Sequence, residues 1–214
     1  MKQHRIPPLL ADIVQSSILA FDRMVFDRRD ACPACGGLLT GYDTRARQFA
    51  IMIREGKPYP VQVFVKRFTC RECGILCSAD EPFYPDTRSG SLVVDLCRTL
   101  AETMPFHRTA MYLAQMGIIV DRGTIRKYTR QSFPVIPTTA LFGIRLPLSV
   151  VSLASLATSG GEGSPVAGAE ALAACGFPSA YRAAPHLPLF SEKRDERYEQ
   201  EGDEERQPQY PEDR

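Results

Sequence analysis

Two closely spaced cysteine pairs constrain this chain more than any other feature of its sequence. The first pair is Cys32 and Cys35, the second is Cys70 and Cys73, and two residues separate the cysteines of each pair. This spacing lets both thiolates of one turn point at the same ion, and two such turns supply the four sulfurs of a tetrahedral Zn²⁺ site. A glycine follows each pair and suits the left-handed backbone that such a turn needs. The sequence therefore predicts a structural zinc site with Cys32, Cys35, Cys70 and Cys73 as ligands.

Two other roles for paired cysteines fit this sequence less well. A redox-active pair favours a βαβ context, and neither pair has one. A disulfide framework needs an oxidising compartment, and residues 1–8 carry basic side chains without the apolar segment of a secretory signal. Since the chain has seven cysteines, we expect it to lie in the reducing cytoplasm.

The charge of the chain is unevenly distributed. Residues 191–214 carry ten Asp or Glu and five Lys or Arg, so residues 1–190 have a net charge of +6 within a chain total of +1. A basic body is common among nucleic-acid-binding proteins, whereas the acidic segment 191–214 is expected to be a disordered tail. The longest apolar run, 146–158, is too short to span a bilayer, and we expect no membrane association.

Residues 1–29 are predicted to form an N-terminal helix. Apolar side chains over 9–28 recur at helical spacing, with polar side chains between them. A strand over 18–26 is the alternative, because short apolar runs suit both structures. The apolar residues are Leu10, Ile13, Val14, Ile18, Phe21, Met24 and Val25.

A zinc ribbon is predicted over residues 30–80. Residues 45–54 and 61–69 have the β-branched and aromatic composition of strands, and residues 56–60 contain the glycine and prolines of a turn. A small hairpin buries little apolar surface, so we expect the metal to supply the missing folding energy. Cys77, four residues past Cys73, could substitute as a ligand in a mispaired site. Five cations make the ribbon basic, as a solvated face or as phosphate contacts: Arg45, Arg47, Lys57, Lys66 and Arg67.

A helix-turn-helix is predicted over residues 91–133, after a linker at 81–90. Its first helix has an apolar stripe that includes Cys97, with Ser89 or Ser91 as N-cap. A second helix at 106–116 directs Phe106, Ala110, Leu113 and Ala114 inward, and Gly117 ends it. Ile118 and Val120 are expected to fill the core across the turn, and Asp121 is the expected N-cap of a third helix at 122–131.

The third helix separates apolar from cationic side chains. At 3.6 residues per turn, Ile125, Tyr128 and Thr129 share one side. The opposite side is cationic and suits entry into a DNA major groove, although a solvated face on an ordinary helical bundle remains the alternative. The expected DNA contacts are Arg126, Lys127 and Arg130, with Arg122 and Thr124 at the helix start.

Residues 106–128 resemble the N-terminal helix-turn-helix of insertion-sequence (DDE-type) transposases. The shared features are an aromatic-x-Arg opening at Phe106 and Arg108, Leu-x-x-x-Gly-Ile ending at Ile118, and the capped Thr-Ile-x-x-Tyr of 124–128. The resemblance includes a preceding zinc ribbon and covers about residues 30–132. It implies site-specific binding of double-stranded DNA, with Arg108 added to the contacts and a homodimer suited to repeated sites.

The chain departs from those transposases where catalysis is concerned. They continue into an RNase-H-like domain whose two aspartates and one glutamate hold two metal ions. Residues 133–190 contain no aspartate and only Glu162 and Glu170 as acids. The acids upstream, Asp86, Asp95 and Glu102, lie in the linker and the first helix and are expected to be surface carboxylates. The sequence therefore predicts a protein that is not an enzyme, either a truncated transposase or a regulator.

Residues 134–190 are predicted to be irregular with short helices near 150–158 and 166–175. The glycine-rich stretch 159–165 lacks the Lys-Ser/Thr of a phosphate-binding loop, so no nucleotide is expected. Taken together, the sequence predicts an α+β fold in which a zinc-ribbon β-hairpin precedes a three-helix bundle and a poorly ordered C-terminal part. The predicted function is zinc-stabilised, sequence-specific DNA binding, and a zinc-ribbon protein-interaction module without DNA affinity is the alternative.

Overall fold

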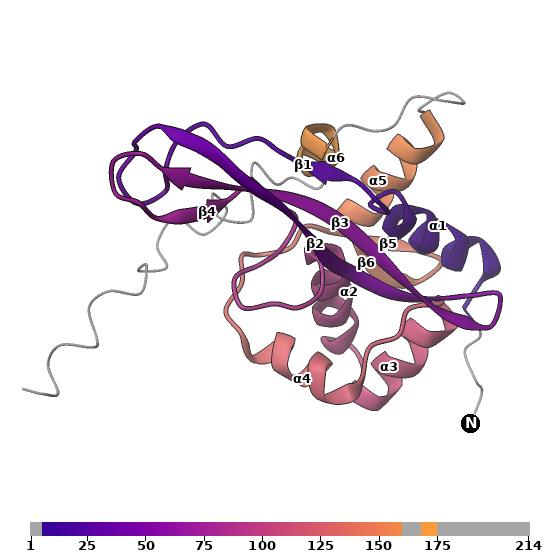
Figure 1. Ribbon diagram of the computed structural model, residues 1–214. Coiled ribbons are helices and arrows are strands. Elements are labelled where there is room, and N and C mark those ends of the chain that lie inside the picture. Colours follow the sequence, from indigo (N-terminus) through magenta and orange to yellow (C-terminus); the bar gives the residue numbers. More distant parts are fainter. Residues whose placement is uncertain (1–5, 160–167, 175–214) are drawn as a thin grey trace, which may run out of the picture. The chain divides into compact units, whose positions relative to one another are not determined.

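The computed structural model describes residues 6–159 and 168–174, and the predicted acidic tail at 191–214 lies outside these ranges. The described part is a mixed α+β fold, as predicted (Figure 1). Its elements are α1 (Pro8–Leu19), β1 (Val25–Phe26), β2 (Leu39–Arg54), β3 (Lys57–Cys70), β4 (Leu76–Ser78), α2 (Ser91–Ala101), α3 (Phe106–Gln115), α4 (Arg122–Arg130), β5 (Thr138–Leu141), β6 (Ile144–Pro147), α5 (Leu148–Ser159) and α6 (Gly168–Ala174).

A long antiparallel hairpin of β2 and β3 is the largest element of the fold. Its two strands are longer than predicted, and the turn is Glu55 and Gly56 alone, whose positive φ values of 53° and 74° suit a two-residue hairpin loop. Strand β3 lies centrally in the sheet, with β2 on one side and the short β1 and β4 on the other. Strand β1 runs parallel to β3, and β4 runs antiparallel to it.

Pro58 and Pro60 lie within β3 rather than in the turn. They pair in register with Ile53 and Ile51 of β2. Ile53 N donates to Gly117 O and Ile51 O accepts from Ile119 N, so the polar groups of these two residues point away from β3. The two pairs are therefore the non-hydrogen-bonded kind, in which a missing proline N–H costs no bond to β2.

The N-terminal helix is shorter than predicted. Helix α1 ends at Leu19, Arg23 has a positive φ of 61°, and Val25 and Phe26 form β1. The apolar spacing continues past the end of the helix because Phe21, in the turn, and Phe26, in β1, both reach the hydrophobic core. Both side chains are fully or almost fully buried. The prediction of one helix over 9–28 was wrong beyond residue 19.

The half of the hairpin beside the cysteines projects beyond the helices (Figure 1). Residues 40–46 of β2 are all exposed, whereas Phe49, Ala50 and Met52 are buried in the core. A β-bulge between Gln48 and Ala50 separates the two halves and turns the Phe49 ring inward. We call residues 30–46 and 66–78 the arm.

One hydrophobic core joins segments that the sequence analysis assigned to different parts. Phe49 stacks on Phe21 with ring centroids 4.2 Å apart and meets the edge of Phe83 at 5.9 Å. These rings come from β2, from the turn after α1 and from the segment predicted as a linker. That segment has no helix or strand, as expected, but most of its side chains are buried, among them Glu81, Phe83 and Tyr84.

Helix α2 lies between the hairpin and the pair α3 and α4 (Figure 1). It begins after Gly90, with no side-chain cap, so the predicted cap at Ser89 or Ser91 was wrong. Almost every residue of α2 is buried, including Cys97 as expected. Asp95, predicted to be a surface carboxylate, is only 2% exposed because other elements cover α2 on its polar side too.

The α3–turn–α4 unit follows the predicted pattern closely. Gly117 has a φ of 79°, Leu113 and Ile118 are fully buried, and Asp121 caps α4. Ala114 is exposed rather than buried, and Met116 is buried in its place. The turn also forms a β-bridge between Ile118 and Met52 of β2, so the hairpin edge holds the turn in place.

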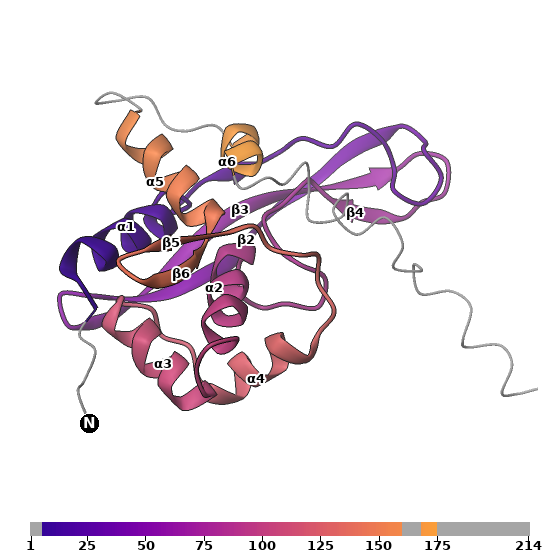
Figure 2. The same ribbon diagram turned by 180° about the vertical axis from the view of Figure 1, so that it is seen from behind.

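Residues 134–159 contain more regular structure than predicted. Strands β5 and β6 form a hairpin through Phe142 and Gly143, and α5 follows within one residue of the predicted end. Helix α5 packs on α1 (Figure 2), where Ser17 Oγ lies 2.7 Å from the carbonyl oxygen of Val150. Among the described helices, none has the length and apolar character needed to cross a membrane.

Candidate metal centre and cationic helix

Two backbone turns place the four predicted cysteines together. In the first turn, Gly36 N donates to Cys32 O at 2.9 Å, and in the second, Gly74 N donates to Cys70 O at 3.1 Å. Gly36 and Gly74 have φ values of 76° and 71°, the left-handed conformation that the sequence predicted for these positions. We call these turns, residues 32–37 and 70–75, the knuckles.

The two knuckles face each other at the end of the arm because they flank paired strands. Leu39 is in register with Cys70, and Arg71 N donates to Leu38 O at 2.9 Å. Each knuckle thus begins or ends one strand of the same hairpin, so strand pairing alone brings the cysteines of residues 32–35 to those of residues 70–73. The residues between the two cysteine pairs thus form the hairpin that aligns one knuckle with the other.

The four sulfur atoms have the spacing of a metal site. Cys32 Sγ lies 3.6 Å from Cys73 Sγ, Cys35 Sγ lies 3.4 Å from Cys70 Sγ, and all four atoms lie within 4.8 Å of one another. A zinc tetrahedron with Zn–S bonds of about 2.3 Å has sulfur–sulfur edges of about 3.8 Å. Within residues 6–159 and 168–174, this is the single cluster of three or more His, Cys, Asp or Glu side chains with such spacing.

Backbone N–H groups favour the thiolate form of the first cysteine in each knuckle. The N–H of Cys35 is the main cause that lowers the pKa of Cys32. The N–H of Cys73 acts in the same way on Cys70 and, with that of Glu72, lowers the pKa of Cys70 to about 6. Since the thiolate is the metal-binding form, these N–H groups favour that form at Cys32 and Cys70.

Cys77 lies close to the cluster but does not belong to it. It is half-buried on β4, and burial raises the pKa of its thiol. Cys97 is fully buried in α2, where burial raises the pKa of its thiol as well. Cys175 lies outside the described residues.

Helix α4 presents the predicted division between apolar and cationic sides. Ile125 and Tyr128 are buried, while four cations, Arg122, Arg126, Lys127 and Arg130, are exposed. Thr124 is half-buried at the helix start, where its N–H donates to Asp121 Oδ1 at 2.9 Å. Arg108 is exposed on α3.

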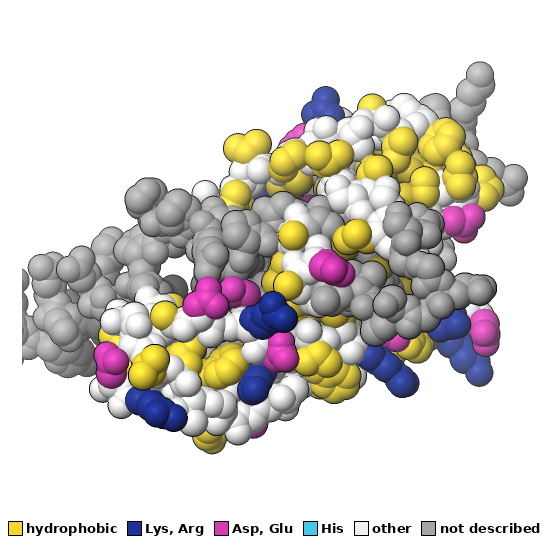
Figure 3. Space-filling model, turned by 90° about the horizontal axis from the view of Figure 1, so that it is seen from above, with side chains coloured by type: hydrophobic (Ala, Val, Ile, Leu, Met, Phe, Trp, Pro, Cys, Tyr) yellow, Lys and Arg dark blue, Asp and Glu magenta, His cyan; other side chains and the backbone are white. Residues whose placement is uncertain are grey.

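The cations of α4 are not neutralised by neighbouring acids. Within the described part of the chain, ion pairs such as Arg47 with Glu81 join other residues, and none includes Arg122, Arg126, Lys127 or Arg130. Lys127 Nζ donates instead to the carbonyl oxygen of Asp86 at 3.2 Å. The face of the molecule that is seen from above carries both Lys or Arg and Asp or Glu side chains (Figure 3), so this face has no single sign of charge.

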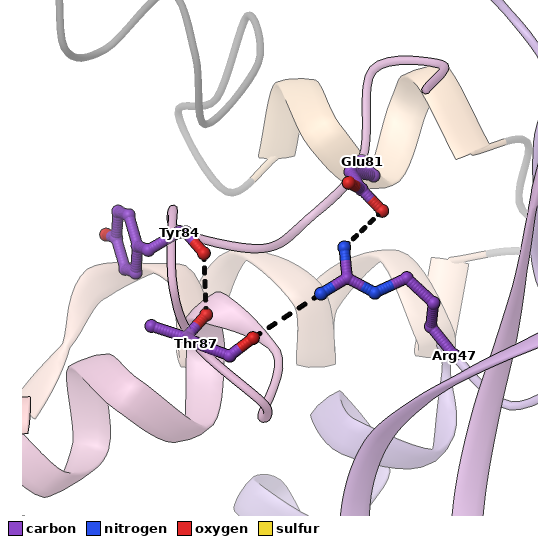
Figure 4. A network of polar contacts seen from close by, with 4 residues as sticks. All are labelled: Arg47, Glu81, Tyr84 and Thr87. Atoms are coloured by element: carbon purple, nitrogen blue, oxygen red, sulfur yellow. Dashed lines mark hydrogen bonds and ion pairs between the residues drawn. The ribbon is translucent and has the colours of Figure 1, made fainter. Parts of the chain in front are cut away.

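A buried polar network holds the segment beside α4 (Figure 4). Arg47 Nη1 lies 2.6 Å from the buried carboxylate of Glu81, and Arg47 Nη2 donates to the carbonyl oxygen of Thr87 at 3.4 Å. The same guanidinium lies over the Phe83 ring, 3.7 Å from its centroid. Burial raises the pKa of Glu81, and the charge of Arg47 opposes that shift. No local sequence pattern indicated this network, because its members come from β2 and from a segment without periodicity.

Comparison of the chain with protein-family models, with curated proteins and with solved structures gave no match.

Proposed function

We propose that this protein is a zinc-stabilised, sequence-specific DNA-binding protein that is not an enzyme. The observation that carries the proposal is the outward face of α4, where Arg122, Arg126, Lys127 and Arg130 are exposed without acidic partners while Ile125 and Tyr128 anchor the helix in the core. An anchored helix with an unneutralised cationic face is what insertion into the DNA major groove requires.

The proposal assigns different roles to the cations of α4. Arginine forms paired hydrogen bonds with guanine, so Arg126 and Arg130 are assigned to base edges. Lys127 is drawn toward Asp86 by its hydrogen bond and is assigned to the DNA backbone. Arg122 and Thr124 at the helix start, and Arg108 on α3, are assigned to phosphates. The nine residues of α4 extend about 13 Å, a length suited to one groove crossing.

The zinc ion has a structural role in this proposal. Four cysteine sulfurs complete a tetrahedral shell and leave no position for water or substrate, which is the arrangement of structural rather than catalytic zinc. Because of the resemblance to insertion-sequence transposases, we propose that the protein is a truncated transposase or a regulator derived from one. We also propose that it binds repeated sites as a homodimer.

The test is selection of bound sequences from a random duplex pool by the zinc-loaded chain, followed by affinity measurements on the selected duplex. Alanine at Arg126 or Arg130 is expected to weaken binding by about 1–3 kcal/mol, or roughly 5- to 150-fold, and to relax the selected sequence. Lys57→Ala is the control, because Lys57 is an exposed cation on the hairpin, outside α4, and the proposal assigns it no DNA contact. Unchanged affinity in both arginine variants would sink the assignment.

A protein-interaction module is the second candidate, and the exposed side chains around the knuckles favour it. Leu38 is 68% exposed, Ile75 46% and Leu76 44%, and large apolar side chains near a metal site suit a protein partner. Salt separates the two candidates. DNA affinity falls steeply as salt increases, whereas an interaction module has little affinity for DNA at any salt concentration.

A further inference from the structure

Residues 86–89 connect the hairpin to α4 through three contacts. Thr87 O accepts from Arg47 of β2, Asp86 O accepts from Lys127, and Ser89 N donates to the hydroxyl oxygen of Tyr128 at 3.3 Å. Arg88 lies between these contact points and is exposed. Its place in the chain thus puts a cation between β2 and the cationic face of α4.

Arg45 adds a further cation on the hairpin. We call Arg45, Arg88 and the four cations of α4 the row. Arg45 is two residues before Arg47 on a regular part of β2, so both side chains leave the same face of the strand, about 7 Å apart. Unlike Arg47, Arg45 is exposed.

The acids near this row are largely engaged by other cations. Glu81 pairs with Arg47, and Asp43 pairs with Arg67. Neither Arg45 nor Arg88 has an ion pair with another described residue. Asp86 is the exposed acid that remains within the row. The charge of Arg45 and Arg88 therefore adds to that of α4 with little cancellation.

We infer that Arg45 and Arg88 bind backbone phosphates of the same duplex whose major groove receives α4. This inference rests on the proposed function and extends it to residues outside the helix-turn-helix. Duplex DNA carries one charge for about every 1.7 Å of its axis, so a row of cations beside the groove meets phosphates whatever the base sequence. Arg45 and Arg88 supply affinity, and α4 supplies the sequence preference.

The experiment measures binding of the full zinc-loaded chain to two duplexes over a range of salt concentrations. One duplex is the sequence that the wild-type chain selects from a random pool, and the other is an unrelated sequence of equal length. The variants are R45A, R88A and their combination, each compared with the lysine replacements R45K and R88K. K57A is the control, since Lys57 lies about 27 Å from Arg45 along the hairpin.

Each alanine variant is expected to lower the slope of log K against log salt by about 0.9, and the double variant by about twice that amount. Affinity falls equally for both duplexes, the lysine variants keep the wild-type slope, and K57A changes nothing. A double variant with wild-type slope and affinity, while R126A and R130A weaken binding, overturns this inference and leaves the proposed function standing. Absence of salt-dependent DNA binding by the wild-type chain overturns both.

Discussion

Asp95 is the residue whose environment differs most from its sequence context. It is a carboxylate on a helix whose apolar stripe suggested an exposed polar side, yet its side chain is buried and accepts a hydrogen bond from Tyr84 at 2.9 Å. Burial raises the pKa of Asp95 to about 7, against smaller opposing effects of the Tyr84 hydrogen bond and the charge of Arg98. A carboxyl group held in this way is protonated in the folded state at pH values where the unfolded chain has lost that proton.

The consequence is a pH-dependent stability. The folded state binds more protons than the unfolded state between about pH 4 and pH 7, so the free energy of unfolding falls as pH rises through this window. Asp95→Asn removes the effect and is expected to stabilise the protein at pH 8, by at most about 4 kcal/mol, and to be nearly neutral at pH 4. Urea unfolding of both proteins at the two pH values measures this. An equal difference at pH 4 and pH 8 would contradict it.

The cysteines allow a second prediction at the scale of single residues. Cys73 and Cys77 are four positions apart, but only Cys73 belongs to the cluster of four sulfurs. Cys73→Ser is expected to lose tightly bound zinc, whereas Cys77→Ser keeps one zinc ion per chain because its half-buried thiol lies outside the cluster. Zinc content after extensive dialysis checks both variants, and loss of zinc from Cys77→Ser alone would refute the ligand assignment.

At the scale of elements, α4 depends on its N-cap. Asp121 accepts hydrogen bonds from the N–H and the hydroxyl of Thr124. These bonds lower the pKa of Asp121. Asp121→Ala is expected to destabilise the protein by about 1 kcal/mol, whereas Asp121→Asn keeps most of the cap. Chemical denaturation at neutral pH gives both values, and an Asn variant as unstable as the Ala variant would show that capping is not the reason.

The elements that sequence analysis identified are those defined by short-range chemistry. Gly117 and Asp121 mark the end of α3 and the start of α4 because a left-handed glycine and a capping carboxylate act within a few residues. The four clustered cysteines were identified for the same reason, through their spacing. The exposed face of α4 followed from helical periodicity, while its contact with DNA remains a prediction.

The elements that sequence analysis missed are those defined by long-range packing. The strands of β5 and β6 have four residues each, too few for a visible alternation. The end of α1 was missed because Met24 and Val25 keep apolar spacing, whereas Val25 and Phe26 pair with β3 as a strand and Met24 O accepts a hydrogen bond from Phe64 N. The ion pair of Arg47 and Glu81 joins residues far apart in the chain, so no local sequence pattern predicts it.

At the scale of the whole molecule, the hairpin belongs to two environments. Its half near Glu55 and Gly56 is part of the core around α2, and its other half forms the arm that carries the knuckles. An isolated zinc ribbon would depend on its metal for folding energy. The core accounts for half of that hairpin without any metal, so a metal bound by the four cysteines can contribute folding energy only to the arm.

Removal of zinc is therefore expected to unfold the arm and leave the core folded. Amide hydrogen exchange with and without a zinc chelator tests this. We expect protection to be lost over residues 39–46 and 66–70 and kept in α2, where nearly every side chain is buried. Equal loss of protection in the arm and in α2 would mean that the fold depends on the metal as one unit.

Pro58 and Pro60 have a further consequence for how molecules of this protein behave toward one another. Both lack an N–H on the side of β3 that faces away from β2, in the stretch between the hairpin turn and β1. An open strand edge invites pairing with a strand of another chain, and such pairing leads to aggregation. Two prolines with their nitrogens on that edge remove the donors that an added strand would need. Pro58 and Pro60 thus cost no hydrogen bond to β2 and at the same time disfavour pairing of β3 with a strand of another chain.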